Sequence, residues 1–305
     1  MIIRGVIFFT SLIFRIFQPT QIGIFFGFLI YIKVSNKIIN LRYQNNYMEK
    51  ITARTNEKIK YAVRLGESAS FRKQNGEFFL EGARLCFDAA KTGVEIRQAF
   101  FTAAALEKYS AYTRSIIATG CICCEISGDV AKKLSDTENP QGVFCICKKK
   151  ESLSVLNCNG KYLALENLQD PSNLGAVCRT VEALGLDGLI VSGGCDVYNP
   201  KAMRAAMGSL LRISLIETDN LIQLLEEAKS NGMNTYASVP RSDAQDIRKA
   251  ALNGGVIICV GNEGSGLSQA AIDTCETAVT IPMGGRAESF NASAAAAILA
   301  WELMR

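Results

Sequence analysis

From residue 160 onward, apolar runs of strand length alternate regularly with runs of helical periodicity. The strand-like runs are KYLALEN, DGLIVSG, RISLIE, NTYASV, GVIICVG and AVTIPM. The helix-like runs cover 172–185, 201–211, 221–231, 244–251, 267–275 and 289–304. Strands that alternate with helices form a parallel sheet covered on both faces. The sequence therefore predicts an α/β fold, with any ligand at the carboxyl ends of the strands.

A smaller α/β domain is predicted over residues 48–150. It opens with a polar helical stretch, NEKIKYAVRLGESASFRKQNG, and EFFLEGARLCFDAAKTG predicts a strand and an amphipathic helix. IRQAFFT, CICCEI and GVFCICKKK predict further strands, and GDVAKKLSD predicts a capped helix. KKKES, residues 148–152, has the composition of a linker. We therefore expect a second domain at 153–305.

The first 47 residues are hydrophobic and hold five Lys or Arg and no acid. Their clean apolar runs, Val6–Phe14 and Ile22–Ile32, are shorter than the roughly 18 residues that a spanning helix needs. No small-residue cleavage site of a signal peptide follows them. Composition changes abruptly at MEKITARTNEKIK, so we expect residues 1–47 to be a translated upstream stretch and the working protein to begin at Met48. A membrane anchor is the alternative.

The charge is unevenly distributed. Residues 49–150 hold 17 Lys and Arg against 12 Asp and Glu, whereas residues 151–305 hold 11 against 17. A basic region beside an acidic one is typical of a protein whose basic part meets a polyanion. Charge scatter on a solvated surface is the other explanation.

Histidine is absent, which excludes His-based triads, His metal sites and the commonest general base. Five of the 11 cysteines cluster in CICCE and FCICK, mostly two residues apart. A zinc site favours C-x2-C pairs, whereas a spacing of two is the period of a strand. We expect cysteines in core strands rather than metal ligands, and free thiols point to a reducing cytoplasm.

The first of three unusual loops is ENLQDPSNLGAVCRTVEALG, 166–185. Asp170 to Asn173 form a turn that caps a helix beginning near Leu174. Arg179 lies six residues beyond Asn173 and carries the single charge between Asp170 and Glu182. On this loop alone, Asn173 is a capping residue, and Arg179 is either a surface residue or a functional one.

The second loop, VGNEGSGLS at 260–268, has three glycines and Glu263 but no lysine. Gly261, Gly264 and Gly266 permit close backbone approach and positive φ, and the following helix offers free N–H groups. Without lysine the loop suits a triphosphate poorly. Its backbone could hold an adenosine, and Glu263 could pair with Arg179 or with a cationic ligand, although tight turns also use glycine routinely.

The third loop, IPMGGRAESFNASAAAAILAWELMR at 281–305, leads from a strand into a helix. We expect Ser289, Asn291 and Ser293 in the first turn of that helix, where polar residues usually act as caps. The small side chains of Ala294–Ala297 suit a close helix–helix contact within or between subunits.

Together the segments ENLQDPSNLGAVCRT, GNEGSGLS and IPMGGRAESFNAS resemble the SpoU-type (TrmH-like) RNA 2'-O-ribose methyltransferases of the SPOUT class. The resemblance covers 160–305. It extends less specifically to 49–150, where FFLEGARL and KKLSDTENPQGVF are similar to the family's L30e-like substrate-binding domain.

The resemblance implies S-adenosyl-L-methionine (AdoMet) as cofactor, a C-terminal trefoil knot, and a cytoplasmic homodimer with the active site at its interface. It also implies an RNA substrate, rRNA rather than tRNA, and neither a metal nor a membrane. Topology rules call knots rare, so the pattern alone does not predict one.

The family motifs also assign residues. They imply a catalytic role for Asn173, Arg179, Glu263, Ser289 and Asn291, and a cofactor-binding role for Gly261, Ile281 and Phe290. The family more often has Leu at the position of Phe290, which changes the shape of the pocket.

Other functions remain open at this point. A tRNA 2'-O-methyltransferase and a non-catalytic RNA-binding protein are alternatives with the same fold. A nucleotide-binding dehydrogenase would need a G-x-G-x-x-G turn after an early strand, and none follows KYLALEN.

Overall fold

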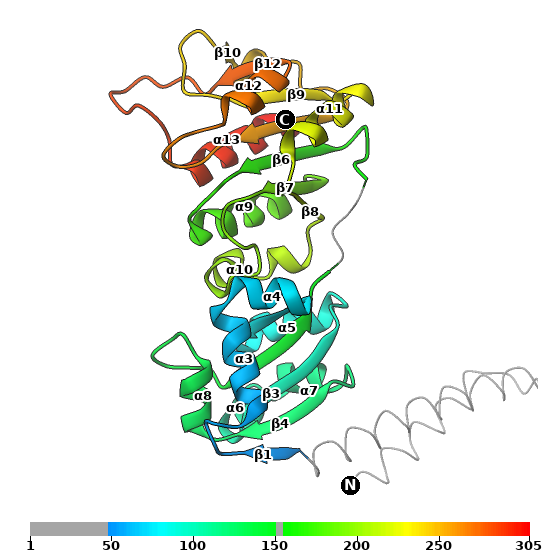
Figure 1. The fold of residues 1–305 in the computed structure, drawn as a ribbon, viewed down its shortest axis with the longest axis vertical. Helices are drawn as coiled ribbons and strands as arrows, with labels where there is room; N and C mark the ends of the chain where they lie inside the picture. Colours follow the sequence, from blue (N-terminus) through cyan, green and yellow to red (C-terminus); the bar gives the residue numbers. More distant parts are fainter. Residues whose placement is uncertain (1–47, 151–154) are drawn as a thin grey trace, which may run out of the picture.

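The computed structural model describes residues 48–150 and 155–305, which fold into two α/β units placed end to end (Figure 1). The predicted extension at 1–47 lies outside the described residues, as does part of the predicted linker. Within the described residues, no helix is long and apolar enough to cross a membrane.

The N-terminal unit contains one five-stranded mixed sheet, in the order β1-β4-β3-β5-β2. Its elements are β1 (Glu49–Ile51), α3 (Glu57–Glu67), α4 (Ala69–Asn75), β2 (Glu77–Glu81), α5 (Ala83–Lys91), β3 (Ile96–Thr102), α6 (Ala103–Lys108), α7 (Ser110–Ile117), β4 (Ile122–Ile126), α8 (Gly128–Leu134) and β5 (Val143–Lys148).

The clustered cysteines lie in strands of this sheet, as the spacing of two predicts. Cys124 on β4 and Cys145 and Cys147 on β5 are fully buried free thiols. Burial raises the pKa of the Cys147 thiol well above its ordinary value, because the charged thiolate is disfavoured away from water. In the parts of the chain that the structure describes, no group of three or more His, Cys, Asp or Glu could hold a metal ion.

The C-terminal unit contains a seven-stranded sheet in the order β10-β12-β9-β11-β6-β7-β8. All of its strand pairs are parallel, as predicted. Its elements are β6 (Lys161–Glu166), α9 (Pro171–Leu184), β7 (Gly188–Ser192), α10 (Pro200–Ala206), η1 (Ser209–Leu211), β8 (Leu215–Thr218), α11 (Leu221–Ser230), β9 (Asn234–Ser238), β10 (Gln245–Asp246), η2 (Ile247–Lys249), β11 (Val256–Val260), α12 (Gln269–Thr274), β12 (Thr277–Thr280) and α13 (Ala292–Met304).

Alternate residues of the central strands face two different helical layers. On β6, Leu163 and Leu165 belong to the cluster packed under α9, α10 and α13, whereas Tyr162 and Ala164 belong to the cluster packed under α11 and α12. A strand buried on both faces needs apolar residues at every position, which explains the continuous runs in the sequence. The predicted three-layer α/β architecture is confirmed.

Two predicted helices are wrong. The stretch 244–251 forms β10 and η2, because Gln245 pairs with Val279 of β12 and the Asp246 carboxylate binds the Arg248 backbone and guanidinium. The predicted helix at 201–211 is interrupted, because Met207 and Gly208 have φ angles of 49° and 85°. Such positive φ angles end a right-handed helix.

Replacing a helical glycine by alanine should have opposite effects on stability at two positions, Gly175 and Gly66. A Cβ on Gly175 in α9 would lie 2.5 Å from Ala205 Cβ and 2.7 Å from the Ala202 carbonyl oxygen of α10. The nearest contact for Gly66 in α3 would be Phe79 at 3.8 Å. We expect Gly175→Ala to lower the free energy of unfolding by about 1–3 kcal/mol through overpacking. Gly66→Ala should raise it by up to about 1 kcal/mol because alanine is the better helix former.

Urea unfolding of both variants and the parent measures these differences. Equal effects of the two substitutions would show that α9 and α10 are not in close contact.

Candidate active site

The three predicted loops meet at the carboxyl ends of β6, β11 and β12. Hydrogen bonds join the first loop to the second. The Glu166 carboxylate at the end of β6 accepts from the Ser268 backbone N–H at 2.7 Å and from the Ser268 hydroxyl at 2.6 Å. The Asn262 side chain donates to the Asn167 carbonyl oxygen at 2.8 Å. Parallel strands end on the same edge of the sheet, which brings loops far apart in sequence together.

The glycine-rich loop closes on itself. The backbones of Asn262 and Gly266 exchange two hydrogen bonds of 3.0 Å, and the Asn262 side-chain oxygen accepts from the N–H groups of Gly264 and Ser265. A Cβ on Gly261 would lie 2.1 Å from the carbonyl carbon of Gly266. Gly261 is therefore required so that the two ends of the loop can approach each other.

Glu263 holds the first loop. Its carboxylate accepts hydrogen bonds of 3.0 Å from the backbone N–H groups of Gln169 and Asp170 and from the Asn173 side chain. Partial burial opposes ionisation, but these hydrogen bonds outweigh it and lower the pKa of Glu263 below its ordinary value of 4.5. The carboxylate is thus engaged with the chain itself rather than with Arg179.

The third loop joins the same set of hydrogen bonds. The Asn291 side chain donates to Asn173 Oδ1 at 3.2 Å, and its own Oδ1 accepts from the Ser293 N–H at the start of α13. Asn173 is nearly buried, at 8% exposure, and links Glu263 to Asn291. Glu263, Asn173 and Asn291 therefore form one continuous chain of hydrogen bonds across the three loops.

The start of α13 differs from the prediction. The helix begins at Ala292 with Asn291 as its cap, so Ser289 lies outside the first turn. The prediction placed the start of the helix too early, because no proline or glycine marks where the helix begins. Without such a residue, a sequence does not separate the polar residues before a helix from those in its first turn. Ser289 is exposed in the preceding loop.

A cleft of about 400 Å³ lies between the second and third loops. Gly261, Glu263, Ile281, Ser289 and Phe290 are among its lining residues. All three predicted cofactor-binding positions therefore border one cavity. Phe290 is 43% exposed, which is unusual for a large apolar side chain and leaves its ring available for contact with a ligand.

Sequence reasoning missed two contributions to the site. Ser238, the last residue of β9, and residues 239–241 after it line the same cleft, and their position at the end of a buried strand was the available signal. Glu166 was also missed, although it is an acid at the end of an apolar strand and only 8% exposed. Burial of a carboxylate is costly unless it is hydrogen-bonded, and Ser268 provides those bonds.

Arg179 is separate from this network. It lies on α9 with an exposed side chain, and its guanidinium makes no hydrogen bond or ion pair with any residue in 48–150 or 155–305. Six helical residues correspond to about 600° of rotation, so Arg179 and Asn173 point to different sides of α9. In a single chain, Arg179 is therefore not joined to the other predicted catalytic residues.

The fold and the cleft define a parallel α/β protein with a ligand site at the carboxyl ends of its strands. Comparison with known families identifies it further. The profile of the SpoU rRNA Methylase family matches residues 160–301, and that of the MRM3-like substrate binding domain matches residues 56–145.

Similar proteins cover most of the chain. The 23S rRNA (guanosine(2553)-2'-O)-methyltransferase RlmP of Bacillus subtilis is 31% identical over 84% of this chain and 99% of its own length. An RNA 2'-O ribose methyltransferase of known structure is 31% identical, with a TM-score of 0.70 over 84% of this chain and 98% of that one. An AdoMet-bound rRNA methyltransferase from Sinorhizobium meliloti is 27% identical with a TM-score of 0.75, covering 84% and 97%.

The chain belongs to the SpoU rRNA methylase family. The resemblance that its three loop motifs carry is thereby confirmed.

Glu263→Gln should loosen the first loop, because an amide nitrogen cannot accept the hydrogen bond that a carboxylate oxygen accepts. Near pH 7 we expect the free energy of unfolding to fall by roughly 1–2 kcal/mol. A carboxyl group whose pKa is lowered by folding stabilises the native state above its unfolded value of 4.5, and this contribution is lost as the pH falls through the lower folded-state pKa.

Urea unfolding at pH 7 and in acid well below pH 4.5 measures the effect, and Glu288→Gln in the exposed third loop is the matched control. A parent–variant difference that is the same at both pH values would mean that the Glu263 charge does not stabilise the loop.

Proposed function

We propose that this protein transfers a methyl group from AdoMet to a ribose 2'-hydroxyl of RNA, and that the RNA is ribosomal. The main support is the single cleft at the strand ends that combines Gly261, Ile281 and Phe290 with the Glu263 end of the polar network. This arrangement occurs in a chain of the SpoU family whose relatives are named as rRNA and tRNA methyltransferases.

The cleft suits AdoMet in size and chemistry. Its volume of about 400 Å³ lies within the range of about 300–1,000 Å³ typical of small-molecule sites. Apolar side chains of Leu267, Ile281 and Phe290 can contact an adenine ring, and the turn at Gly261 offers backbone donors and acceptors. When bound, AdoMet supplies an activated methyl carbon.

The chain's own residues would then position the ribose and stabilise charge. A ribose hydroxyl is a weak nucleophile, and its proton would pass to water or to the neighbouring RNA phosphate as the 2'-oxygen takes the methyl group. Arginine stays protonated in proteins, so Arg179 binds the neighbouring phosphate and stabilises the developing oxyanion rather than acting as a base. Asn173, Glu263 and Asn291 hold the loops in place, and Ser289 on the cleft wall orients the hydroxyl.

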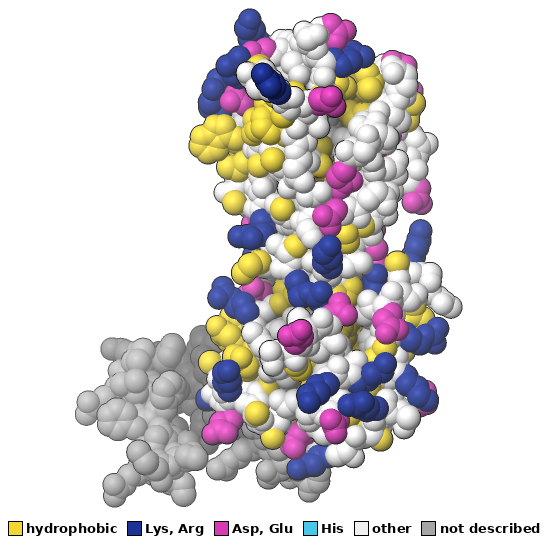
Figure 2. All heavy atoms as spheres, turned by 90° about the vertical axis from the view of Figure 1, so that its left-hand side faces the viewer, with side chains coloured by type: hydrophobic (Ala, Val, Ile, Leu, Met, Phe, Trp, Pro, Cys, Tyr) yellow, Lys and Arg dark blue, Asp and Glu magenta, His cyan; other side chains and the backbone are white. Residues whose placement is uncertain are grey.

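A homodimer would complete the site. Arg179 is exposed and unpaired within the described chain, and α13 packs on α9 with Trp301 and Met304 left 59% and 37% exposed. Exposed large apolar side chains favour a subunit interface. Hydrophobic side chains gather on the upper, C-terminal half of the face in Figure 2. We propose that Arg179 enters the cleft of the partner subunit.

The finer details of the fold belong to the same proposal. The chain leaves β12, passes through the third loop and returns as α13 against α9, β6 and β11, a path compatible with the trefoil knot of the SPOUT class.

The N-terminal unit, with its L30e-like assignment, would bind RNA, because it holds the excess of positive charge and phosphate contacts dominate RNA affinity. Figure 2 shows Lys and Arg side chains over much of this lower unit. Free thiols favour a cytoplasmic location.

Two measurements test the activity. Equilibrium dialysis should detect binding of AdoMet and none of NAD. Mapping of 2'-O-methyl groups in total RNA, from cells with and without the gene, should reveal a nucleotide that loses its methyl group. A lost modification in tRNA instead of rRNA would identify the alternative substrate, and unchanged RNA would refute the proposal.

Arg179→Ala should abolish most methyl transfer without weakening AdoMet binding. Loss of one preorganised charge donor typically costs about 10²–10³ in rate. Arg179→Lys should restore little, since a point charge does not reproduce the planar guanidinium. Single-turnover transfer to RNA and calorimetric titration with AdoMet separate the two effects. Near-parental rates in both variants would show that Arg179 is a surface residue.

Mixing two inactive variants tests where Arg179 acts. Asn173→Ala and Arg179→Ala subunits, co-refolded or exchanged, should form mixed dimers in which one of the two sites combines an intact Asn173 with the partner's intact arginine. Recovery of activity on mixing is expected. If mixing recovers none although exchange is verified, Arg179 serves its own subunit.

A further inference from the structure

Arg72 connects the two units through a buried ion pair. It lies on α4, is only 1% exposed, and its Nε is 2.5 Å from Oδ2 of Asp196, which belongs to the C-terminal unit. Its Nη1 donates to the carbonyl oxygens of Leu65 and Gly66 at 2.6 and 3.0 Å. A buried charge without such partners is strongly destabilising, so Arg72 strongly favours the position of Asp196 seen here.

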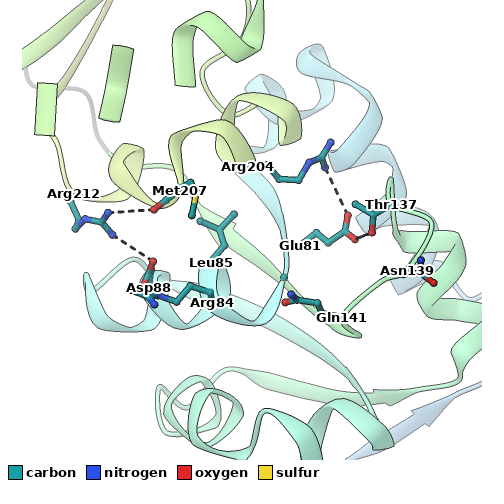
Figure 3. A pocket seen from close by; sticks show the side chains of 11 residues that line it. Glu81, Arg84, Leu85, Asp88, Thr137, Asn139, Gln141, Arg204, Met207 and Arg212 are labelled. Carbon is teal, nitrogen blue, oxygen red and sulfur yellow. Dashed lines mark hydrogen bonds and ion pairs between the residues drawn. The ribbon is translucent and has the colours of Figure 1, made fainter. Parts of the chain in front are cut away.

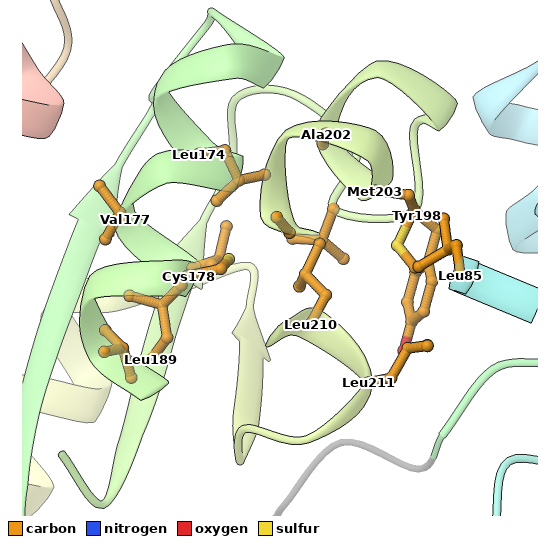
Figure 4. Packing of buried hydrophobic residues seen from close by; sticks show 14 of the residues in the cluster. Leu85, Leu174, Val177, Cys178, Leu189, Tyr198, Ala202, Met203, Leu210 and Leu211 are labelled. Carbon is orange, nitrogen blue, oxygen red and sulfur yellow. The ribbon is translucent and has the colours of Figure 1, made fainter. Parts of the chain in front are cut away.

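Apolar side chains surround this ion pair. The rings of Phe78 on β2 and Tyr198 before α10 are 4.7 Å apart, and Figure 4 shows Leu85 of the N-terminal unit next to Tyr198 and Met203. These residues belong to one continuous hydrophobic cluster that extends into both units. Inter-domain contacts that are small and polar permit motion, whereas this contact resembles a domain core.

Other ion pairs between the units are more exposed. Arg204 of α10 lies 3.2 Å from Asp136 and 3.9 Å from Glu81, and Arg212 lies 3.7 Å from Asp88. Both arginines, with Glu81 and Asp88, border a cavity of about 590 Å³ at the junction (Figure 3). The arginine side chains of these pairs are 33% and 36% exposed, so water screens the pairs in part. The orientation of the units therefore depends mainly on Arg72 and on the apolar contact.

The segment that holds Asp196 also touches the active site. The N–H of Cys195 donates to the Leu168 carbonyl oxygen at 2.8 Å, and a Cβ on Gly194 would lie 2.2 Å from that same oxygen. Leu168 belongs to the first loop, one residue before Gln169, which donates to Glu263. A displacement of Asp196 would therefore be transmitted to the loop that carries the catalytic network.

We propose that Arg72 and Asp196 fix the N-terminal unit in one orientation relative to the methyl-transfer cleft, so that RNA bound to this unit is presented to the cleft at a set distance. Arg72 is then a positioning residue that determines which nucleotide is methylated. The RNA part of this inference rests on the proposed function, whereas the rigid connection of the units does not.

Calorimetry of the full chain tests the connection without RNA. The parent should unfold in one thermal transition, as expected for a single cooperative unit. AdoMet should raise the midpoint temperature of that whole transition. Arg72→Met keeps the aliphatic stem but removes the charge. Arg72→Met should split the unfolding into two transitions, and AdoMet should raise the midpoint temperature of one of them. Arg114→Met is the matched control and should leave one transition. Arg114 is an exposed residue of α7 whose side chain, among the described residues, hydrogen-bonds to Ser110 alone.

Methyl transfer tests the consequence for RNA. With total RNA from cells lacking the gene, Arg72→Met should lower transfer at the mapped nucleotide on the order of 10²-fold, because small misplacements far from the chemistry have effects of this size. AdoMet affinity should stay within about threefold, which a general disruption of the catalytic loops would not allow. Asp196→Asn should behave like Arg72→Met. The same measurements are made on Asp196→Asn if Arg72→Met does not fold.

The outcomes decide between the possibilities. Two transitions in the parent, or one transition with parental methylation in both Arg72→Met and Asp196→Asn, would overturn the proposal. A large loss of AdoMet affinity would assign Arg72 to maintenance of the cleft and would overturn it as well. If the parent itself methylates no RNA, the proposed function fails, and calorimetry still decides whether the ion pair connects the units.

Discussion

The hydrogen-bond chain from Glu263 through Asn173 to Asn291 is the interaction on which the candidate site depends. Each member belongs to a different loop, and each loop follows a different strand. These hydrogen bonds therefore hold the three loops in one arrangement beside the cleft that the second and third loops line. Networks of this kind act cooperatively, so that removing one member weakens the others. Asn173 is nearly buried and bonded on both sides, which makes it a structural link at least as much as a contact for substrate.

The sequence predicted the C-terminal architecture well because its information is local. Strand β11, VIICV, is apolar at every position, and β6 is apolar over its central four residues, 162–165. A sheet buried on both faces favours such continuous apolar runs. The errors occurred where a short segment is determined by partners distant in sequence. Gln245 and Asp246 became a strand through pairing with β12, and no periodicity within 244–251 could show that.

The sequence predicted which residues belong to the site but not which of them are hydrogen-bonded to each other. The three motifs identified Glu263, Asn173 and Asn291 as important polar residues, yet the direction of each hydrogen bond came from the fold. For Glu263 the sequence left open a pairing with Arg179 or with a cationic ligand. Its carboxylate binds the first loop, and Arg179 points to another side of α9. The Arg72–Asp196 pair could not have been inferred, since 124 residues separate its members and neither belongs to a motif.

The glycine-rich loop has a consequence for the thermodynamics of ligand binding. Asn262 already satisfies the N–H groups of Gly264 and Ser265, and the backbones of Asn262 and Gly266 are bonded to each other. A disordered loop loses conformational entropy when it binds a ligand. This loop has already lost that entropy during folding. Association at this cleft should therefore proceed with little ordering of the loop, and the heat-capacity change of binding should reflect buried ligand surface rather than coupled folding.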